Sequence, residues 1–232
     1  MELFLEGLTG AFRRIVTFDR DVLEAASASL AVSGTATALS ILIGIPLGAV
    51  LGLARFRGRN LALSIVNTGM GLPPVVVGLF VATLVWRSGL LGDLDWYCTR
   101  PAIVLAQVIL AAPTVMGLTA VALQSVDPML RTQLTSLGAT GLQSAWLLVR
   151  ESRLLLISAA LAGFGAVISE IGASLMTGCN VKGDTRILTT AIALETSKGE
   201  FGSAYALAFI LLALVFAVSG VTTWAQQRPR PL

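Results

Sequence analysis

Glu170 is the most unusual residue that could do chemistry in this sequence. It is the one Asp, Glu, Lys or Arg in the otherwise apolar stretch 154–181. If this stretch crosses a bilayer, a charge within it costs at least about 2.5–3.5 kcal/mol, so the carboxylate is expected to face other helices or water. The carboxylate either marks a functional position or forms a structural hydrogen bond with a neighbouring helix or an Arg, and both interpretations are open. An acid is in either case a poor direct ligand for an anion.

Other reactive side chains are scarce. The sequence has no His and only two Cys, so a metal site of the usual ligand types is not expected. It has no Gly-Lys pair and therefore no phosphate-binding loop for ATP. It also lacks a His motif or a close pair of carboxylates within an apolar stretch, which an enzyme buried in a membrane would need.

Long apolar segments must position these groups. Hydrophobic residues make up 55% of the chain and charged residues 12%, about half the usual charged share. Four further stretches contain no Asp, Glu, Lys or Arg, namely 25–54, 60–86, 101–126 and 201–227. Each exceeds the roughly 20 apolar residues that cross a bilayer, so we predict an all-α membrane protein with about five spans. The predicted spans are 27–54, 62–86, 102–124, 154–177 and 203–224, inside a transmembrane domain at 25–227 that precedes a short tail at 228–232.

The first 24 residues mix charged and apolar side chains, which does not suit a cleavable signal peptide. Apolar residues at helical spacing predict an amphipathic helix over 1–18, lying at the membrane interface. A solvated and partly disordered tail is the alternative interpretation.

Loop charges decide the orientation only weakly. With the N-terminus outside, the cytoplasmic loops hold eight of the sixteen Lys and Arg, and the external segments hold the other eight. The density of Arg55, Arg57 and Arg59 in one short loop favours an external N-terminus and a cytoplasmic C-terminus. Cys98 and Cys179 then both lie outside, where a disulfide is permitted. Since the sequence does not bring them together, we predict two unpaired thiols.

Glycine and proline mark two special places in the spans. A repeat of small residues at Gly44, Gly48 and Gly52 is typical of closely packed membrane helices. Pro73 and Pro74, with glycines around them, predict a kinked or partly unwound start of the second span. This irregular backbone either lines a translocation pathway or forms an interfacial cap on an ordinary helix, and both interpretations are open.

The uncharged stretch 132–149 is too polar for a sixth span. Its several Thr, Ser and Gln side chains would lie in hydrocarbon, and Gly138 interrupts the helix. We predict two short helices joined at Gly138 in a surface loop. The later stretch 178–202 is predicted to be a re-entrant or surface connection between the last two spans.

These segments resemble a known family. The loop 131–140, Arg-Thr-Gln-Leu-Thr-Ser-Leu-Gly-Ala-Thr, resembles the coupling loop of binding-protein-dependent ABC importer permeases, whose signature is Glu-Ala-Ala, three residues and then Gly. Gly138 matches, whereas the acidic and alanine positions do not. The block 163–201 is similar to molybdate, sulfate and tungstate permeases, with Glu-x-Gly-Ala at 170–173 and Gly-x-Asn-x-x-Gly-x-Thr-x-x-Leu at 178–188. The sequences Gly-Leu-Pro-Pro from Gly71 and Arg-Glu-Ser-Arg from Arg150 point to the tungstate branch.

The resemblance covers about 25–225 and implies a type I ABC importer transmembrane domain that is not itself an enzyme. It implies an ATP-driven importer of an oxyanion, tungstate first and molybdate or sulfate as alternatives, in a bacterial or archaeal cytoplasmic membrane. It further implies three kinds of partner: a second permease copy, two ATPase subunits that bind ATP and Mg²⁺, and an extracytoplasmic oxyanion-binding protein. It implies no cofactor in this chain and no nucleic-acid partner. The coupling loop would span 131–153. Its expected contact residues are Leu134, Leu137, Gly138, Ala139 and Leu142.

Such a role is physically reasonable because moving a dianion inward against a potential of 100 mV costs about 4.6 kcal/mol. Near the expected outer end of the path, Asn180, Lys182, Thr185 and Arg186 offer hydrogen-bond donors and positive charge. They are predicted to shape an external gate, with Pro73, Pro74 and Glu170, or the docking surface for the binding protein. In the alternative interpretation they cap helices and contact headgroups.

A secondary transporter that needs no ATPase is a second hypothesis. It would use Glu170 as a proton-linked site in a Pro- and Gly-broken pathway. The short chain, the lack of a detectable internal repeat and the coupling-type loop argue against it.

Overall fold

The computed structural model describes residues 2–17 and 19–227, and within these ranges it contains helices and no strand. The helices, in chain order, are α1 (Glu2–Val16), α2 (Arg20–Leu53), α3 (Arg59–Met70), α4 (Pro74–Val85), the 3₁₀ turn η1 (Gly92–Leu94), α5 (Arg100–Gln124), α6 (Pro128–Ser136), α7 (Gly141–Glu151), α8 (Arg153–Ile168), α9 (Gly172–Gly178), α10 (Leu188–Ser197) and α11 (Phe201–Gln227). The all-α prediction is confirmed. The predicted tail at 228–232 lies outside the described residues.

In the described part of the chain, three helices are long and apolar enough to cross a membrane, namely α2, α5 and α11. Two bent pairs also qualify if each pair is one span: α3 with α4, bent by 98°, and α7 with α8, bent by 69°. The chain can therefore cross a membrane up to five times.

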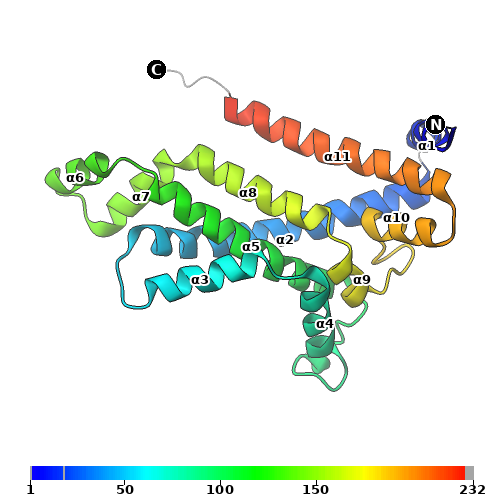
Figure 1. Cartoon of the computed structure of the whole chain (residues 1–232), viewed down its shortest axis with the longest axis horizontal. Coiled ribbons are helices and arrows are strands. Elements are labelled where there is room, and N and C mark those ends of the chain that lie inside the picture. The colour runs from blue at the N-terminus through cyan, green and yellow to red at the C-terminus, as the bar shows by residue number, and fades with distance from the viewer. Residues whose placement is uncertain (1, 18, 228–232) are drawn as a thin grey trace.

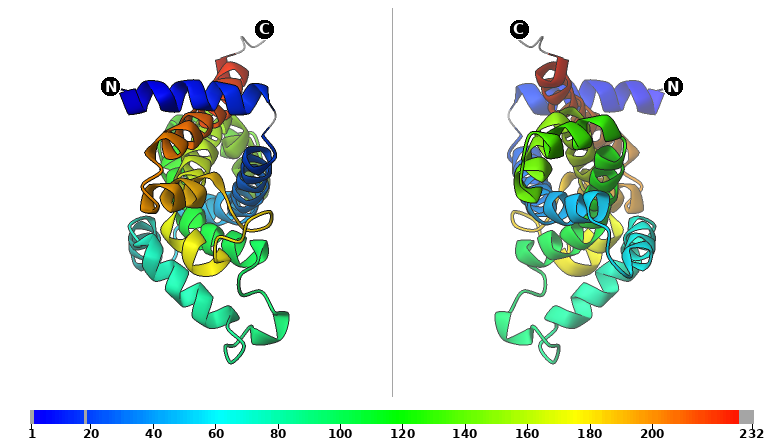
Figure 2. Two further views of the ribbon diagram at one scale, coloured as in Figure 1. Left: turned by 90° about the vertical axis from the view of Figure 1, so that its right-hand side faces the viewer. Right: turned by 90° about the vertical axis from the view of Figure 1, so that its left-hand side faces the viewer.

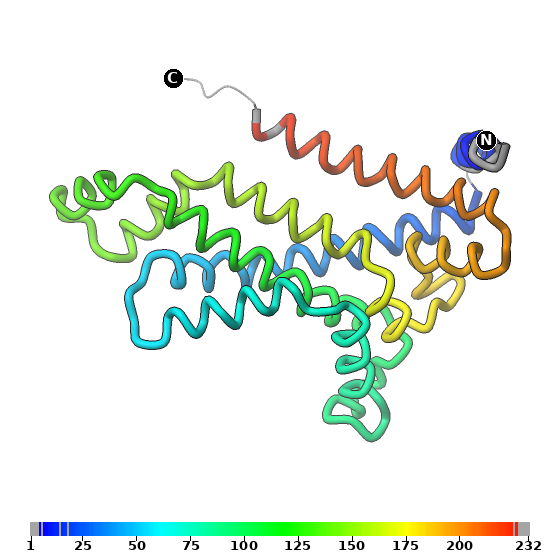
Figure 3. The backbone as a smooth tube through the Cα atoms, viewed as in Figure 1, coloured from blue at the N-terminus to red at the C-terminus, as the bar shows by residue number. Residues whose placement is uncertain are grey.

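The longer helices run lengthwise in one bundle, with short helices at its two ends (Figure 1). The smooth tube shows α6 and α7 together at one end and α9 and α10 at the other (Figure 3). We call these the α6–α7 end and the α9–α10 end. Helix α4 leaves the bundle sideways, and α1 lies across the bundle beside α11 (Figure 2).

Glycines allow α2 to approach α5 closely. A Cβ atom added at Gly44 would lie 2.9 Å from the Val115 Cβ, and one added at Gly48 would lie 2.5 Å from the Met116 carbonyl oxygen. A real Cβ does not fit at such distances, so the small residues are required for this contact. The predicted packing role of the glycine repeat is confirmed.

The prolines break the second predicted span near its middle. Pro73 is extended and precedes the first turn of α4, where Pro74 is tolerated because the missing N–H would have no partner within the helix. The predicted irregularity is present, but α3 is already helical from Arg59 and the direction changes by 98° at residues 71–73. Helix α4 then packs against α5 and α9 through a buried cluster: Val77, Val81, Val85, Ala102, Ala106 and Ala173.

The fourth predicted span, 154–177, is not one straight helix. Helix α8 ends at Ile168, and the separate short helix α9 begins at Gly172. The interruption contains Glu170, whose contacts give the physical reason for it and are described below. Residues 179–200 then form a loop, α10 and a turn, where a connection between the last two spans was predicted over 178–202.

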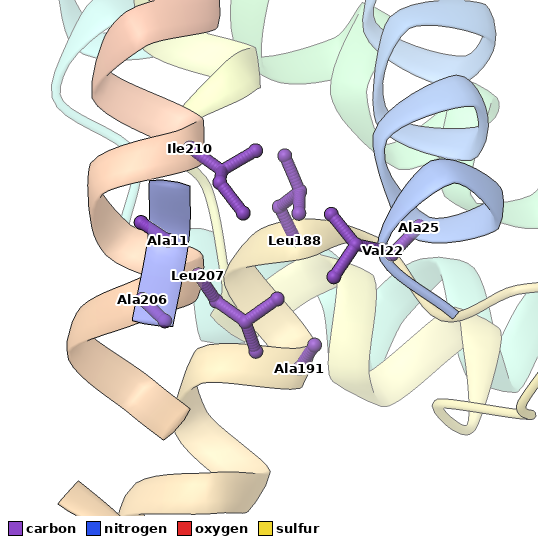
Figure 4. Close-up of a cluster of buried hydrophobic side chains, with 8 residues drawn as sticks. All are labelled: Ala11, Val22, Ala25, Leu188, Ala191, Ala206, Leu207 and Ile210. Atoms are coloured by element: carbon purple, nitrogen blue, oxygen red, sulfur yellow. The ribbon is translucent and has the colours of Figure 1, made fainter. Parts of the chain in front are cut away.

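The N-terminal helix is held by a second buried cluster where α1, α2, α10 and α11 meet (Figure 4). Its members are Ala11, Val22, Ala25, Leu188, Ala191, Ala206, Leu207 and Ile210. The predicted helix is therefore present at Glu2–Val16, and it packs on α11. Phe12 and Ile15 on α1 remain 72% and 50% exposed, as a helix at a membrane interface requires. Its place in a membrane remains a prediction.

Candidate functional site

Glu170 is buried at the start of α9, where it binds main-chain N–H groups. Its carboxylate accepts hydrogen bonds from the N–H groups of Ala173 at 2.6 Å and Ser174 at 3.0 Å, and from the Ser174 hydroxyl at 2.7 Å. These N–H groups have no partner within the helix, and a negative charge is favourable at a helix N-terminus. The carboxylate thus satisfies the backbone that the α8–α9 interruption exposes. This geometry agrees with the structural interpretation of Glu170.

Neighbouring helices complete the hydrogen bonding of this interruption. The Thr189 hydroxyl of α10 donates to the Glu170 carbonyl oxygen at 2.9 Å. The fully buried Gln107 of α5 donates from Nε2 to the Val167 carbonyl at 3.2 Å and to the Ser174 hydroxyl at 3.4 Å. Helices α5, α8, α9 and α10 are therefore joined by one polar network. Gln107 was not among the predicted site residues, although an amide in the charge-free stretch 101–126 is a detectable signal.

Helices α4 and α9 are two short half-helices that pack side by side. A Cβ added at Gly78 of α4 would lie 2.6 Å from the Ala173 Cα, and one added at Gly172 of α9 would lie 2.7 Å from Val75. Pro73 and Pro74 therefore set the start of α4 beside the start of α9, close to Glu170. Irregular backbone of this kind at membrane depth requires surrounding protein or a water-filled path. The exposed faces of Leu79 and Phe80 on α4 leave room for such a path or for another subunit.

The polar residues after α9 mainly bind their own loop. Thr185 is fully buried, donates its hydroxyl to the Gly178 carbonyl and accepts the Val181 N–H at 2.9 Å. The Arg186 guanidinium donates to the Asn180 side-chain oxygen at 3.2 Å and to the Asn180 carbonyl at 3.3 Å. Asn180 itself donates to the Thr190 carbonyl at 3.3 Å. Three of the four residues predicted to shape an external gate or a docking surface thus form hydrogen bonds with the backbone of residues 178–190.

The fourth predicted residue, Lys182, lies on the surface of the same loop. Its ammonium group is 2.6 Å from the Asp21 carboxylate at the start of α2. On the other side of the loop, Arg100 at the start of α5 donates to the Asp184 carbonyl at 2.8 Å. The loop is thereby connected to the first turns of both α2 and α5.

The prediction of two unpaired thiols is wrong, because Cys98 and Cys179 form a disulfide. Their Cα atoms are 5.1 Å apart, although 81 residues separate them in sequence. The packing of α5 beside α9 brings them together. The bond joins Cys98, two residues before α5, to Cys179, the residue after α9, so the loop 179–187 is also attached covalently.

The candidate coupling segment lies at the opposite end of the bundle. The prediction of two short helices joined at Gly138 is confirmed, with α6 ending at Ser136 and α7 beginning at Gly141. Gly138 has a φ of +79°, a value that side chains with a Cβ rarely adopt. Thr140 and Gln143 form a capping box that starts α7.

Apolar side chains of this segment face outward. Leu137 and Leu142, which flank the turn, are 83% and 84% exposed, while Leu134 and Ala139 are half-buried. The structure adds Met129 on α6 and Trp146 on α7, each 67% exposed. These two were not predicted, because they lie outside the motif residues from which the contact residues were chosen. We call Met129, Leu137, Leu142 and Trp146 the apolar end surface. Such a cluster of exposed apolar residues is typical of a binding surface.

The comparisons with known proteins define the class. Residues 44–231 match the family described as the inner membrane component of binding-protein-dependent transport systems. The chain belongs to this family. It is a permease subunit and a multi-pass membrane protein rather than an enzyme.

Particular relatives are similar over most of their length. The chain is 41% identical to a probable anion ABC transporter permease protein of Haloferax volcanii. The aligned region covers 83% of this chain and 85% of that relative. It is 36% identical to the tungstate uptake system permease protein TupB of Peptoclostridium acidaminophilum, over 95% of this chain and 97% of that protein. It is 29% identical to the molybdenum transport system permease protein ModB of Escherichia coli, covering 84% and 90%.

Solved structures share the fold. A chain of the MetNI methionine ABC transporter in an inward-facing conformation matches with a TM-score of 0.77 over 91% of this chain and 97% of that chain, at 18% identity. A chain of a bacterial alginate ABC transporter, solved in complex with a periplasmic protein, matches with a TM-score of 0.68 over 93% and 84%, at 17% identity. The fold is that of a type I ABC importer transmembrane domain, as predicted.

Proposed function

We propose that this chain is the permease subunit of an ATP-driven importer for a tetrahedral oxyanion, tungstate in the first place. The observation that carries the proposal is the 36% identity to a tungstate uptake permease over 95% of the chain. The lower identity to a molybdenum permease, 29%, makes molybdate the second candidate. The motif block 163–201, which resembles molybdate, sulfate and tungstate permeases, supports the same anion class.

The proposed assembly has two copies of this chain, two ATPase subunits that bind ATP and Mg²⁺, and an extracytoplasmic oxyanion-binding protein. One chain offers one apolar end surface, and two ATPase subunits need two, which favours a homodimer. The outward apolar face of α4, with Leu79 and Phe80 53% and 66% exposed, is suited to contact the second copy. The loop 179–187, at the α9–α10 end of the bundle, is suited to contact the binding protein.

We propose that the α9–α10 end faces outward and that the α6–α7 end faces the cytoplasm. The disulfide supports this, since such bonds persist outside the cytoplasm and are rare within it. Arg55, Arg57 and Arg59 then lie on the cytoplasmic side, in agreement with the positive-inside rule. With five crossings, the N-terminus lies outside and the C-terminus inside.

The proposed organisation keeps an interfacial segment at 1–24, a transmembrane domain at 25–227 and a tail at 228–232. Helix α2 starts at Arg20, so its first turn belongs to the interfacial segment in this division.

The proposed mechanism links the two ends of the bundle. ATP-driven closure of the ATPase subunits moves α6 and α7, which are continuous with α5 and α8 through short connections. Motion of α5 and α8 is transmitted to the α8–α9 interruption, where Gln107 and Glu170 join the helices. The half-helices α4 and α9 then rearrange between outward-open and inward-open states.

The anion is tested by ATP hydrolysis in liposomes that contain this chain with its cognate ATPase and binding protein. The binding protein is loaded in turn with tungstate, molybdate and sulfate. We expect the largest stimulation with tungstate. A larger stimulation with molybdate would change the assigned anion, and anion movement by this chain alone, without ATP, would favour a secondary transporter.

The coupling surface is tested by Leu142→Ser, with Leu90→Ser as the matched control. Leu90 is 88% exposed but lies between α4 and α5, away from the α6–α7 end. Loss of an apolar anchor at the centre of an interface weakens binding by about tenfold or more. We expect weaker ATPase association for Leu142→Ser only. Equal association of both variants would show that the apolar end surface does not bind the ATPase.

A further inference from the structure

Three arginines surround a cavity at the α6–α7 end. The cavity has a volume of about 330 Å³ and is lined by the C-terminal ends of α2 and α5 and the first turn of α6. Its charged lining residues are Arg55, Arg59 and Arg131. The function proposed above does not use this cavity.

Two of the arginines are held in place by helix ends. The Arg59 guanidinium donates from Nε to the Leu51 carbonyl of α2 at 2.8 Å, and Arg131 donates from Nη2 to the Leu123 carbonyl of α5 at 2.9 Å. Each interaction satisfies a carbonyl in the last turn of a helix, where no main-chain partner is present. A guanidinium has five N–H donors, so each arginine retains further donors for a ligand.

The positive charge at this cavity is not balanced by acids. Within residues 2–17 and 19–227, none of the three arginines forms an ion pair with a carboxylate. The acid adjacent in sequence, Asp127, is exposed and accepts the Met129 N–H at 2.8 Å, which caps α6. Two helix C-termini contribute about half a negative charge each, so a net positive charge of about two remains.

We propose that this cavity binds a tetrahedral oxyanion group and that the bound group fastens α6 to the ends of α2 and α5. Arginine matches the geometry of phosphate-type groups because its planar N–H donors pair with two oxygens at once. Two sources have this chemistry: the phosphodiester of an anionic lipid headgroup and a free oxyanion such as phosphate or tungstate. Basic pockets between membrane helices on the cytoplasmic side are known to bind anionic headgroups.

The consequence for coupling follows from the lining residues. Arg131 belongs to α6, whereas Arg55 lies between α2 and α3 and Arg59 begins α3. An anion between them would connect the coupling segment to the glycine-packed pair α2 and α5, independently of the ATPase. Binding of the anion would therefore make α6 less mobile.

The test uses the full chain without its partners, in two arms. In the first arm, delipidated protein in an uncharged detergent is titrated calorimetrically with inorganic phosphate and with tungstate. In the second arm, the protein is placed in nanodiscs of phosphatidylcholine with or without phosphatidylglycerol, and retained phosphatidylglycerol is counted by native mass spectrometry. We expect binding in at least one arm, and the arm that responds identifies the source.

The variants are Arg55→Gln, the triple variant Arg55→Gln/Arg59→Gln/Arg131→Gln, and the matched control Arg57→Gln. Arg57 lies in the same turn but does not line the cavity. Loss of one charge-assisted hydrogen bond should weaken binding by about tenfold for Arg55→Gln, and the triple variant should lose it. Screening by salt should keep the change for Arg57→Gln below about twofold.

Arg55→Gln also decides the test if the triple variant fails to fold. Arg59 and Arg131 bind helix carbonyls, whereas no hydrogen bond to Arg55 is found in the described part of the chain. No binding in either arm, or equal loss with Arg57→Gln, would overturn the proposal. Unchanged anion binding by Arg55→Gln would also overturn it. Because neither arm involves transport, the outcome is independent of the imported anion.

Discussion

At the α9–α10 end the polar side chains turn inward and bind the backbone, whereas at the α6–α7 end apolar side chains turn outward to solvent. Glu170, Thr185 and Arg186 are occupied with main-chain groups of α9 and its following loop. Leu137 and Leu142 are more than four-fifths exposed at the other end. The difference teaches that a residue's type does not show whether its side chain is accessible: here these polar groups are held by the backbone, and the apolar ones are exposed.

The two ends also differ in how strongly they are attached to the bundle. The loop 179–187 is connected by a disulfide, an ion pair and several hydrogen bonds. Helices α6 and α7 have no fully buried side chain except Leu148. Local stability is therefore expected to be high at the α9–α10 end and low at the α6–α7 end, as is usual for segments that move.

The largest expected effect comes from the disulfide. Replacement of both cysteines in Cys98→Ser/Cys179→Ser should lower the free energy of unfolding by about 2–4 kcal/mol, because the bond closes a long segment of chain. Thermal unfolding in detergent measures this. Reducing agent should lower the melting temperature of the unmodified protein and leave that of the double variant unchanged. An equal response of both would show that the bond does not stabilise the α9–α10 end.

The next effect is expected for Glu170→Ala. This change leaves the Ala173 and Ser174 N–H groups buried without an acceptor, which should cost about 1–3 kcal/mol in the free energy of unfolding. Glu170→Gln keeps one acceptor oxygen and should cost less. The measurement is chemical unfolding of both variants in the same detergent. If Glu170→Ala unfolds like the unmodified protein but loses transport, the functional interpretation of the carboxylate is correct instead.

A smaller and local effect is expected at Gly138, where φ is +79° and an added Cβ meets no neighbour. Gly138→Val should cost about 1–2 kcal/mol through backbone strain alone, and Gly138→Asn should cost less because Asn tolerates this conformation. Hydrogen exchange should become faster in α6 and α7 only. Faster exchange throughout the bundle would show that the α6–α7 end is not a separate local unit.

The smallest effect is expected for the ion pair between Lys182 and Asp21, whose side chains are both about 60% exposed. Lys182→Met should change the free energy of unfolding by at most about 1 kcal/mol, and the difference should shrink in high salt. Asp21→Asn should change the free energy of unfolding by the same amount as Lys182→Met. The double variant should show no larger change than either single variant. A larger change would mean that Lys182 stabilises the loop by another contact.

The elements with strong local signals were predictable. Charge-free runs indicated the long helices, and the proline pair indicated the break before α4. Gly138 correctly indicated two short helices. These features depend on residues close in sequence, so a single chain is sufficient to recognise them.

Features that depend on tertiary packing were not predictable. Cys98 and Cys179 meet only because α5 lies beside α9. The α8–α9 interruption has no proline, and its signal is Glu170 itself, which the sequence alone could not distinguish from a transport residue. Trp146 was missed because exposure on a short helix is decided by what the rest of the fold leaves uncovered.

The glycine contact between α2 and α5 has a mechanical consequence. Pro46 lies inside α2 between Gly44 and Gly48, so it falls where the neighbouring helix approaches most closely. A proline in a helix interior removes one main-chain hydrogen bond and leaves a point that bends easily. Helix α5 packs against α2 at this point. Helix α5 has an interior proline of its own, Pro113, two residues before the Val115 that Gly44 meets. Both helices therefore have a point that bends easily in the same region of their contact, and the close packing couples a bend of α2 to a bend of α5.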